Sequence, residues 1–290
     1  MKKFLKKSLA RAVHQERVWR LLDRSLFKLT RFLEREKFRN DNAPPPPVLD
    51  LAAVWQTIAP DLTVRHGPFR GLKYPAGKSV GSMLVPKLLG SYERELQPLL
   101  ARLAARDYSE IVDVGCAEGY YAVGLARMFA RARVFAFDTN AEGLRLCRLM
   151  AEANGVADRL TTGSFCDAAA LQNLPLTRRA LVISDCEGYE QHLFNPDTVR
   201  KLAGHDVLIE VHDLVDITIS ARLRAVFSST HQLEVIASVD DIHKAQTYEY
   251  PELAAFSLAE RKLLLAEWRA AAMEWFYFSP RANGDRKSET

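Results

Sequence analysis

The sequence predicts an α/β protein with a doubly wound, mostly parallel seven-stranded sheet whose last strand is antiparallel. From residue 108 to residue 213, short apolar runs alternate with amphipathic runs. Such alternation requires crossover connections, which produce parallel strands with helices on both faces. Beyond residue 213 the pattern changes to an apolar run, a long polar and aromatic stretch, and a final aromatic run. With 290 residues, 48% of them hydrophobic and 26% charged, the chain can bury a large core, and collagenous or wholly disordered classes are excluded.

Each element is predicted from a local pattern. Apolar runs of three to five residues indicate strands, and they cover 110–114, 133–137, 160–162, 180–183, 207–211, 233–237 and 274–278. Helical spacing and capping residues predict helices over 91–106, 120–130, 142–153, 196–203 and 257–272. Ser91 is expected to cap the first helix, because Glu93 and Glu95 then lie in its first turn near the positive end of the helix dipole.

Four segments follow from composition. Residues 1–43 are expected to form a basic amphipathic helical extension, and residues 44–90 a proline-rich linker with a pre-core segment of short strands and turns. Residues 91–280 hold the main domain, in which 240–272 form an insertion expected to act as a lid or a dimer contact. Residues 281–290 are polar and are expected to form a flexible tail.

Charge is divided unevenly along the chain. Residues 1–40 hold 13 Lys and Arg against 4 Asp and Glu, a net charge of +9, which leaves −5 for the other 250 residues. The N-terminal segment is therefore expected to dock on its own domain, on a second copy in a homo-oligomer, on another protein or on an anionic membrane surface, with contact to nucleic acid as the remaining alternative for this segment. Nucleic acid is an unlikely partner for the negatively charged body. No run of about 18 uncharged apolar residues is present, so no transmembrane helix is expected. The four cysteines lack paired metal-ligand spacing, which indicates a reducing, cytoplasmic setting. The protein is expected there either free or peripheral at a membrane surface.

Acidic residues lie at or just after the end of every predicted parallel strand. They are Asp113, Asp138, Asp167, Asp185, and the group Glu210, His212 and Asp213. In open α/β sheets, ligands bind beyond the carboxyl ends of the strands. The ligand site is therefore expected at this edge.

The turn after the first strand discriminates between cofactors. Its small residues are Gly115, Ala117 and Gly119, spaced G-x-A-x-G, whereas a dinucleotide site has G-x-G-x-x-G. Asp113 precedes the turn and would repel a pyrophosphate, but it suits a cation or an amine. Asp138, 25 residues further on, can accept both hydroxyls of a ribose. These residues favour S-adenosylmethionine over NAD.

Two groups of residues resemble those of a known family. Residues 112–120 (VDVGCAEGY) and 135–138 (FAFD) are similar to the first two motifs of class I S-adenosylmethionine-dependent methyltransferases, which have a Rossmann-like fold, with Ala117 at the usual middle glycine. Residues 184–190 (SDCEGYE) and 208–212 (LIEVH) resemble the D-x-E-G-x-E and E-x-H motifs of the FkbM-type enzymes, which commonly methylate hydroxyl oxygens. The class-level resemblance covers residues 91–280.

This resemblance implies roles for individual residues. The implied cofactor-binding residues are Asp113, Gly115, Ala117, Gly119, Tyr120, Asp138, Thr139, Ser164, Phe165, Cys166 and Asp185. Tyr92 and Glu93 would lie where such enzymes close over the cofactor. The candidates for the catalytic base are His212, Asp185 and Glu187. His212 is the first choice, because its ordinary pKa is near neutral. The alternative role for His212 is to orient the two acids.

We therefore expect a methyltransferase (EC 2.1.1.-) that transfers a methyl group in line to a hydroxyl of a sugar or other small molecule. Methylation of an amine or a protein side chain is the second reading, and a catalytically silent binding module tethered by its basic helix is the third. A mechanism with Mg²⁺ held by Asp185 with Glu210 or Asp213 is kept open beside the base mechanism. A nucleic-acid enzyme is disfavoured, since the fourth strand lacks the Asn/Asp-Pro-Pro-aromatic run of base-methylating enzymes.

Overall fold

The computed structural model describes residues 28–30, 32–33, 37, 49–51 and 53–281. They fall into two compact units, Met1–Pro46 and Pro47–Thr290. Most of the predicted N-terminal helix, the proline run and the tail beyond residue 281 lie outside the described residues. Residues 28–30, 32–33 and 37 are helical. Among the described residues, no helix is both long enough and apolar enough to cross a membrane.

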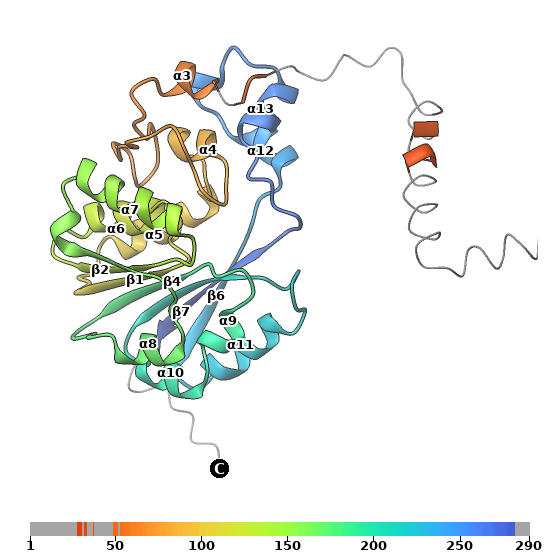
Figure 1. The fold of residues 1–290 in the computed structure, drawn as a ribbon. Helices are drawn as coiled ribbons and strands as arrows, with labels where there is room; N and C mark the ends of the chain where they lie inside the picture. Colours follow the sequence, from red (N-terminus) through yellow and green to blue (C-terminus); the bar gives the residue numbers. More distant parts are fainter. Residues whose placement is uncertain (1–27, 31, 34–36, 38–48, 52, 282–290) are drawn as a thin grey trace, which may run out of the picture. The chain divides into compact units, whose positions relative to one another are not determined.

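The second unit is built on one seven-stranded sheet (Figure 1), which confirms the predicted fold class. Its strand order is β3-β2-β1-β4-β5-β7-β6, with β7 antiparallel to both of its neighbours and the first five strands parallel. The strands are β1 (Glu110–Val114), β2 (Arg133–Phe137), β3 (Leu160–Gly163), β4 (Ala180–Ser184), β5 (Asp206–Val211), β6 (His231–Ala237) and β7 (Glu274–Pro280). Every predicted strand is present, with bounds shifted by at most two residues.

Helices cover both faces of the sheet (Figure 1). One side carries α4 (Leu84–Leu89), α5 (Gln97–Leu103), α6 (Tyr120–Met128) and α7 (Ala141–Ala153), and the other carries α8 (Ala168–Asn173), α9 (Glu190–Leu193), α10 (Pro196–Lys201) and α11 (Ile219–Phe227). Three more helices lie away from the sheet: α3 (Trp55–Ile58), α12 (Asp241–Thr247) and α13 (Leu258–Leu264). The sequence pattern missed α8 and α11, which are short or carry polar residues between their apolar positions.

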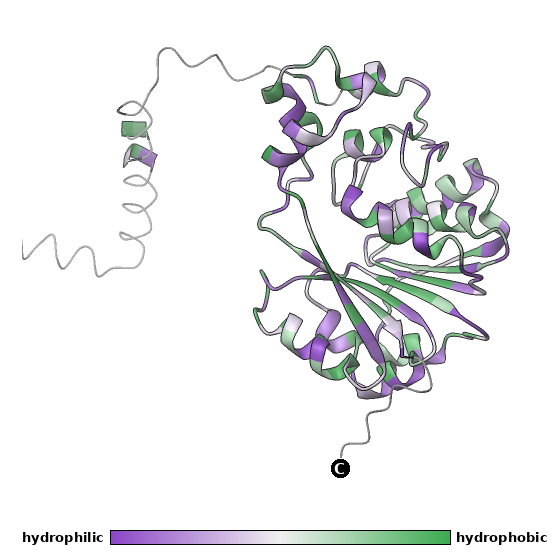
Figure 2. Cartoon of the chain, turned by 180° about the vertical axis from the view of Figure 1, so that it is seen from behind, coloured by the Kyte–Doolittle hydropathy of each residue, from purple (hydrophilic) through white to green (hydrophobic). Residues whose placement is uncertain are grey.

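Apolar side chains alternate between the two faces of each central strand. Ile111 and Leu181 pack into the core under α4–α7, while Val112 and Val182 pack into the core under α8–α11. All residues of β1, β4 and β5 are buried, as expected for parallel strands covered on both sides. Figure 2 shows the long hydrophobic stretches of these strands.

The predicted helix over 91–106 begins later than expected, and Ser91 does not cap it. Residues 94–96 form a 3-10 turn that leads into α5. Glu93 has a left-handed backbone (φ 47°) and is 1% exposed, because its carboxylate pairs with the guanidinium of Arg269. Glu93 was expected in the first turn of this helix, but it is instead the buried partner in an ion pair.

The region 240–272 is an insertion between β6 and β7, as predicted, but it is not one helix from 257. Ser257 and Glu260 form a capping box at the start of α13, which ends at Leu264. α12, which the pattern missed, precedes it and is capped by Asp240. The strands expected within residues 48–90 are also absent from the described residues, apart from one bridge between Thr63 and Lys73.

The segment before residue 91 belongs to the main core. Phe69, Leu72 and Leu88 are buried with the residues of α6 and β1. A buried ion pair fixes it: Lys87 Nζ lies 2.6 Å from Oε1 of Glu118, in the turn after β1, and both side chains are almost fully buried. The same carboxylate accepts hydrogen bonds from the hydroxyl of Tyr74, the hydroxyl of Ser79 and the amide of Val80.

We expect Glu118→Gln to lower the free energy of unfolding by about 3 kcal/mol, because Lys87 is left as a buried, unpaired charge. Lys87 holds the pKa of Glu118 below its ordinary value. The wild-type advantage is therefore full above that ordinary value and is lost as the pH falls through the lowered pKa. Urea unfolding at pH 7 and at pH 3 measures both effects. Glu142→Gln, in an exposed pair with Arg145, is the control and should change little; equal losses in both variants would contradict the prediction.

Candidate functional site

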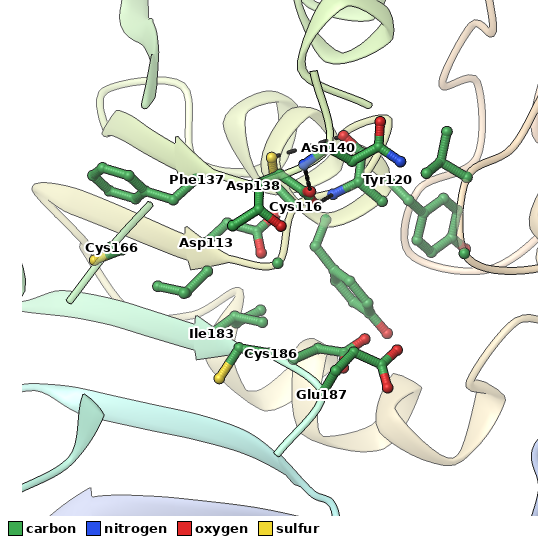
Figure 3. A pocket seen from close by; sticks show the side chains of 18 of the residues that line it. Asp113, Cys116, Tyr120, Phe137, Asp138, Asn140, Cys166, Ile183, Cys186 and Glu187 are labelled. Carbon is green, nitrogen blue, oxygen red and sulfur yellow. Dashed lines mark hydrogen bonds between the residues drawn. The ribbon is translucent and has the colours of Figure 1, made fainter. Parts of the chain in front are cut away.

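A cavity of about 320 Å³ lies at the carboxyl ends of β1, β2 and β4, where the ligand was expected (Figure 3). The predicted site residues that line it are Asp113, Gly115, Ala117, Tyr120, Asp138, Thr139, Ser164, Phe165, Cys166, Asp185 and Glu187. Two predicted residues, Gly119 and His212, do not line it. Gly119 (φ 95°) instead allows α6 to start beside Cys147, whose Sγ would lie 2.8 Å from a Cβ at this position.

Several residues that line the cavity come from regions in which no sequence motif was found. Tyr92, which was predicted to close over the cofactor, lines the cavity, and Glu93 does not. Residues 80–82 also line it, and Glu118 holds them there through the amide of Val80. The remaining unpredicted lining residues include Lys87, Tyr121, Phe137, Asn140, Ile183, Cys186 and Tyr189. No sequence pattern links residues 80–82 to the turn after β1, which contains Glu118 and lies almost 40 positions later.

The turn after β1 approaches the end of β4 so closely that only glycine fits. Gly115 has φ 90°, and a Cβ there would lie 1.6 Å from the carbonyl oxygen of Asp185. Ala117, at the position where related motifs have glycine, also has a left-handed backbone (φ 47°). A hydrogen bond stabilises it, since its amide donates to Oδ2 of Asp138 at 2.7 Å.

Asp138 joins two loops at the rim of the cavity. Oδ1 accepts a hydrogen bond from the amide of Asn140 at 2.7 Å, and Oδ2 accepts the bond from Ala117 (Figure 3). Each carboxylate oxygen can accept a second donor. The carboxylate is therefore oriented by backbone groups and can still receive the hydroxyls of a ribose.

Asp113 is the clearest indication of a missing ligand. Its side chain lines the cavity and is 2% exposed, yet Oδ2 has no hydrogen-bond partner. Burial, with the nearby charge of Asp185, raises the pKa of Asp113 to about 8. A buried carboxylate oxygen without a donor is stabilised by a nearby cation or by a proton. The α-ammonium and sulfonium of S-adenosylmethionine fit this requirement, whereas the pyrophosphate of NAD would add repulsion.

His212 lies behind the cavity wall and is held between carboxylates. Its Nδ1 is 2.7 Å from Oε1 of Glu190, a side chain with no exposed surface. Its Nε2 faces Oδ1 of Asp185 at 3.4 Å and Oε2 of Glu187 at 3.6 Å. Although burial opposes protonation, the hydrogen bond and the negative charge of Glu190 raise the pKa of His212 above its ordinary value. Sequence reasoning did not assign a role to Glu190, although it is the last acid of the D-x-E-G-x-E run.

Donor atoms of Asp185, Glu187 and His212 lie within 4.8 Å of one another and could hold a metal ion. The set expected from the sequence, Asp185 with Glu210 or Asp213, is not the set that the structure brings together. Glu210 pairs with the guanidinium of Arg269, and Asp213 accepts the amide of Ser220 at 2.8 Å.

Arg269, at the end of the 240–272 insertion, does not line the cavity, but it joins the elements around it. Its guanidinium pairs with three carboxylates, those of Glu93, Glu210 and Glu267. It thereby ties the insertion to the residue after Tyr92 on one side and to β5, the strand that His212 follows, on the other. A role of the insertion as a lid or dimer contact stays a prediction.

Comparison with known proteins agrees with this geometry. Residues 96–184 match the family described as Methyltransferase small domain. Two strains of Porphyromonas gingivalis have a tRNA1(Val) (adenine(37)-N6)-methyltransferase that is 24% identical to this chain over 171 residues. The alignment covers 55% of this chain and 65% of the length of these relatives.

Similar solved structures include a putative O-methyltransferase from Klebsiella pneumoniae (11% identity, TM-score 0.44, 85% of this chain and 94% of that one). Another is TrmN from Thermus thermophilus, which is 17% identical with a TM-score of 0.41; the alignment covers 68% of this chain and 52% of that one. A third is precorrin-6y C5,15-methyltransferase from Geobacter metallireducens, which is 15% identical with a TM-score of 0.43; the alignment covers 63% of this chain and 87% of that one. The matching family model covers residues 96–184, so this part of the chain, with strands β1 to β4, is similar to methyltransferases of that family.

Proposed function

We propose that this protein is an FkbM-like methyltransferase that transfers the methyl group of S-adenosylmethionine to a hydroxyl oxygen of a sugar or other small molecule. One observation carries the proposal. Asp185 lines the cavity, and its Oδ1 faces the Nε2 of His212, whose other nitrogen is fixed by the buried Glu190. A hydroxyl is a weak nucleophile and benefits from such an oriented base.

Asp185 is the group placed to accept the proton. Burial first, and then the charge of Glu93, raise the pKa of Asp185 to about 7, while a charged His212 counteracts the rise. When the pKa of a base is near the working pH, a useful fraction of the base is unprotonated, and it still binds the proton strongly enough to take it from the acceptor. His212 was the first choice from the sequence; because it does not line the cavity, we assign it the alternative role of positioning Asp185.

Bound S-adenosylmethionine supplies an electrophilic methyl carbon attached to a positively charged sulfur. Asp113 would face its ammonium group and Asp138 its ribose, which leaves Asp185 and Glu187 beside the acceptor. Asp185 would take the hydroxyl proton as the oxygen–carbon bond forms and the carbon–sulfur bond breaks. The protein's main task is to hold the acceptor oxygen in line at about 3 Å.

The names of the curated relatives suggest a second candidate, methylation of an adenine amino group in RNA. Against it stands the loop after β4, which reads Ser184-Asp185-Cys186-Glu187 and lacks the Asn/Asp-Pro-Pro-aromatic run. Acidic side chains at the mouth, with Glu187 83% exposed, would also repel a phosphate backbone. An amine acceptor would not require Asp185 as a base, so the pH dependence separates the two chemistries.

Cofactor binding is the first test. We expect S-adenosylhomocysteine to bind with micromolar affinity in calorimetric titration, and NAD⁺ not to bind. Asp138→Ala should weaken binding at least about tenfold, since hydrogen bonds to a charged group are lost. Asp197→Ala removes an exposed acid on α10 and should leave the affinity unchanged. A protein that binds neither compound would instead support the reading as a catalytically silent module.

The acceptor class is tested by release of S-adenosylhomocysteine. We expect release with members of a panel of hydroxylated sugars and small molecules, and none with transfer RNA or simple amines. Because the proposal uses a carboxylate base, release should continue in the presence of EDTA. Activity that disappears in EDTA and returns with Mg²⁺ would overturn the base mechanism in favour of a metal at Asp185, Glu187 and His212.

The role of His212 is tested with His212→Asn, which removes the charge beside Asp185. We expect turnover to fall about a hundredfold while the affinity for S-adenosylhomocysteine is retained. Loss of the positive neighbour should raise the pKa of Asp185, so the acidic limb of kcat/KM, expected near pH 7, should move to higher pH. His243→Asn, an exposed change on α12, is the control. Near-normal turnover with an unmoved pH profile would exclude this role.

A further inference from the structure

Three large apolar side chains are exposed on the loop between β5 and α11, just after His212. Leu214, Val215 and Ile217 are 61%, 63% and 78% exposed. Single exposed apolar residues are common on protein surfaces, whereas a contiguous group indicates an interaction site. We call these three residues the apolar rim.

The apolar rim lies next to a loop whose residues line the cavity, although the rim residues do not line it themselves. A Cβ on Gly188 would lie 2.8 Å from Cγ1 of Val215, so the rim packs over the loop that carries Glu187. The next residue, Tyr189, lines the cavity, and its ring centroid is 5.2 Å from that of Phe165, which is 54% exposed. The rim therefore borders the loop that contributes Glu187 and Tyr189 to the cavity lining.

The two acids of this loop are turned back toward the start of α11. Asp216 accepts hydrogen bonds from the amide and the hydroxyl of Thr218, at 2.9 and 2.8 Å. Asp213 accepts the amide of Ser220. Both carboxylates are more buried than the apolar residues beside them. The loop thus presents its apolar side chains outward and keeps its charges close to the body.

The N-terminal unit has its own exposed apolar residues. Leu29, Phe32 and Leu33 are 52–58% exposed and are helical. Their spacing of three and four positions places them on one side of a helix. The net charge of +9 over residues 1–40 is typical of a helix that binds an anionic lipid surface.

We propose that this protein binds an anionic lipid bilayer through two contacts, the basic N-terminal segment by its charge and the apolar rim by insertion of its apolar side chains. A single weak anchor gives only reversible membrane binding, and two contacts together give stable binding. A basic segment, which binds by charge, and a loop with three exposed apolar side chains, which binds by burial of apolar surface, are complementary in this respect. The proposal goes beyond methyl transfer and does not depend on it.

The test is sedimentation of the full-length protein with vesicles of phosphatidylcholine, with or without 30 mol% phosphatidylglycerol, at about 0.05 and 0.5 M salt. The rim variant is Leu214→Ser, Val215→Ser and Ile217→Ser together. The matched control is Val235→Ser, Ile242→Ser and Leu258→Ser together, three other exposed apolar positions. A charge variant replaces Lys2, Lys3, Lys6 and Lys7 by Gln. S-adenosylhomocysteine titration of every variant reports separately on the fold and on the proposed function.

We expect wild type and control to bind anionic vesicles equally, and the rim variant to bind at least tenfold more weakly at both salt concentrations. The charge variant should weaken binding at low salt only, since counter-ions screen the charge contribution at high salt. A rim variant that partitions like wild type, or a wild type that does not bind, would overturn the proposal. So would a self-association of the wild type that the rim variant abolishes without vesicles, which would assign the rim to a second copy.

Discussion

The close approach of β1 and β4 at their carboxyl ends is the constraint on which the site depends. Gly115 has no side chain, and its α-carbon lies against the carbonyl oxygen of Asp185. Any larger residue would force the two strand ends apart. Because β1 and β4 are neighbouring parallel strands, this contact places the acid of β1, Asp113, and the acid of β4, Asp185, around one cavity.

That geometry sets the electrostatics of the cavity. Burial and the charge of Asp185 disfavour ionisation of Asp113, while burial and the charge of Glu93 disfavour ionisation of Asp185. Because both pKa values are raised, a cationic ligand that binds beside these carboxylates would displace protons from them. One acid can then neutralise the cofactor, while the other, with His212 as a neighbour, keeps a pKa near neutrality and remains available to a substrate. Two similar side chains thus acquire different tasks from their surroundings.

The sequence predicted the sheet, its antiparallel last strand and the cavity-lining residues well, because those features follow from local periodicity and from the position of strand ends. It failed where tertiary contacts override local preference. Glu93 looks like a first-turn helix acid but is buried against Arg269, a residue 176 positions away. His212 was placed in the site by its strand end, yet side-chain packing against Glu190 sets it behind the wall. No local pattern reports such contacts.

The distribution of charge around the mouth restricts what can enter. Glu187 is largely exposed beside the two deeper acids, so an acceptor with phosphate groups near its reacting atom would be repelled. A neutral hydroxyl meets no such penalty, and under the proposed mechanism Asp185 would act as its base. The apolar rim packs against the loop that carries Glu187, and burying its apolar side chains is favourable. The two proposals together therefore favour an acceptor that combines an uncharged hydroxyl with an apolar portion, because the acids disfavour phosphate and the rim favours apolar surface.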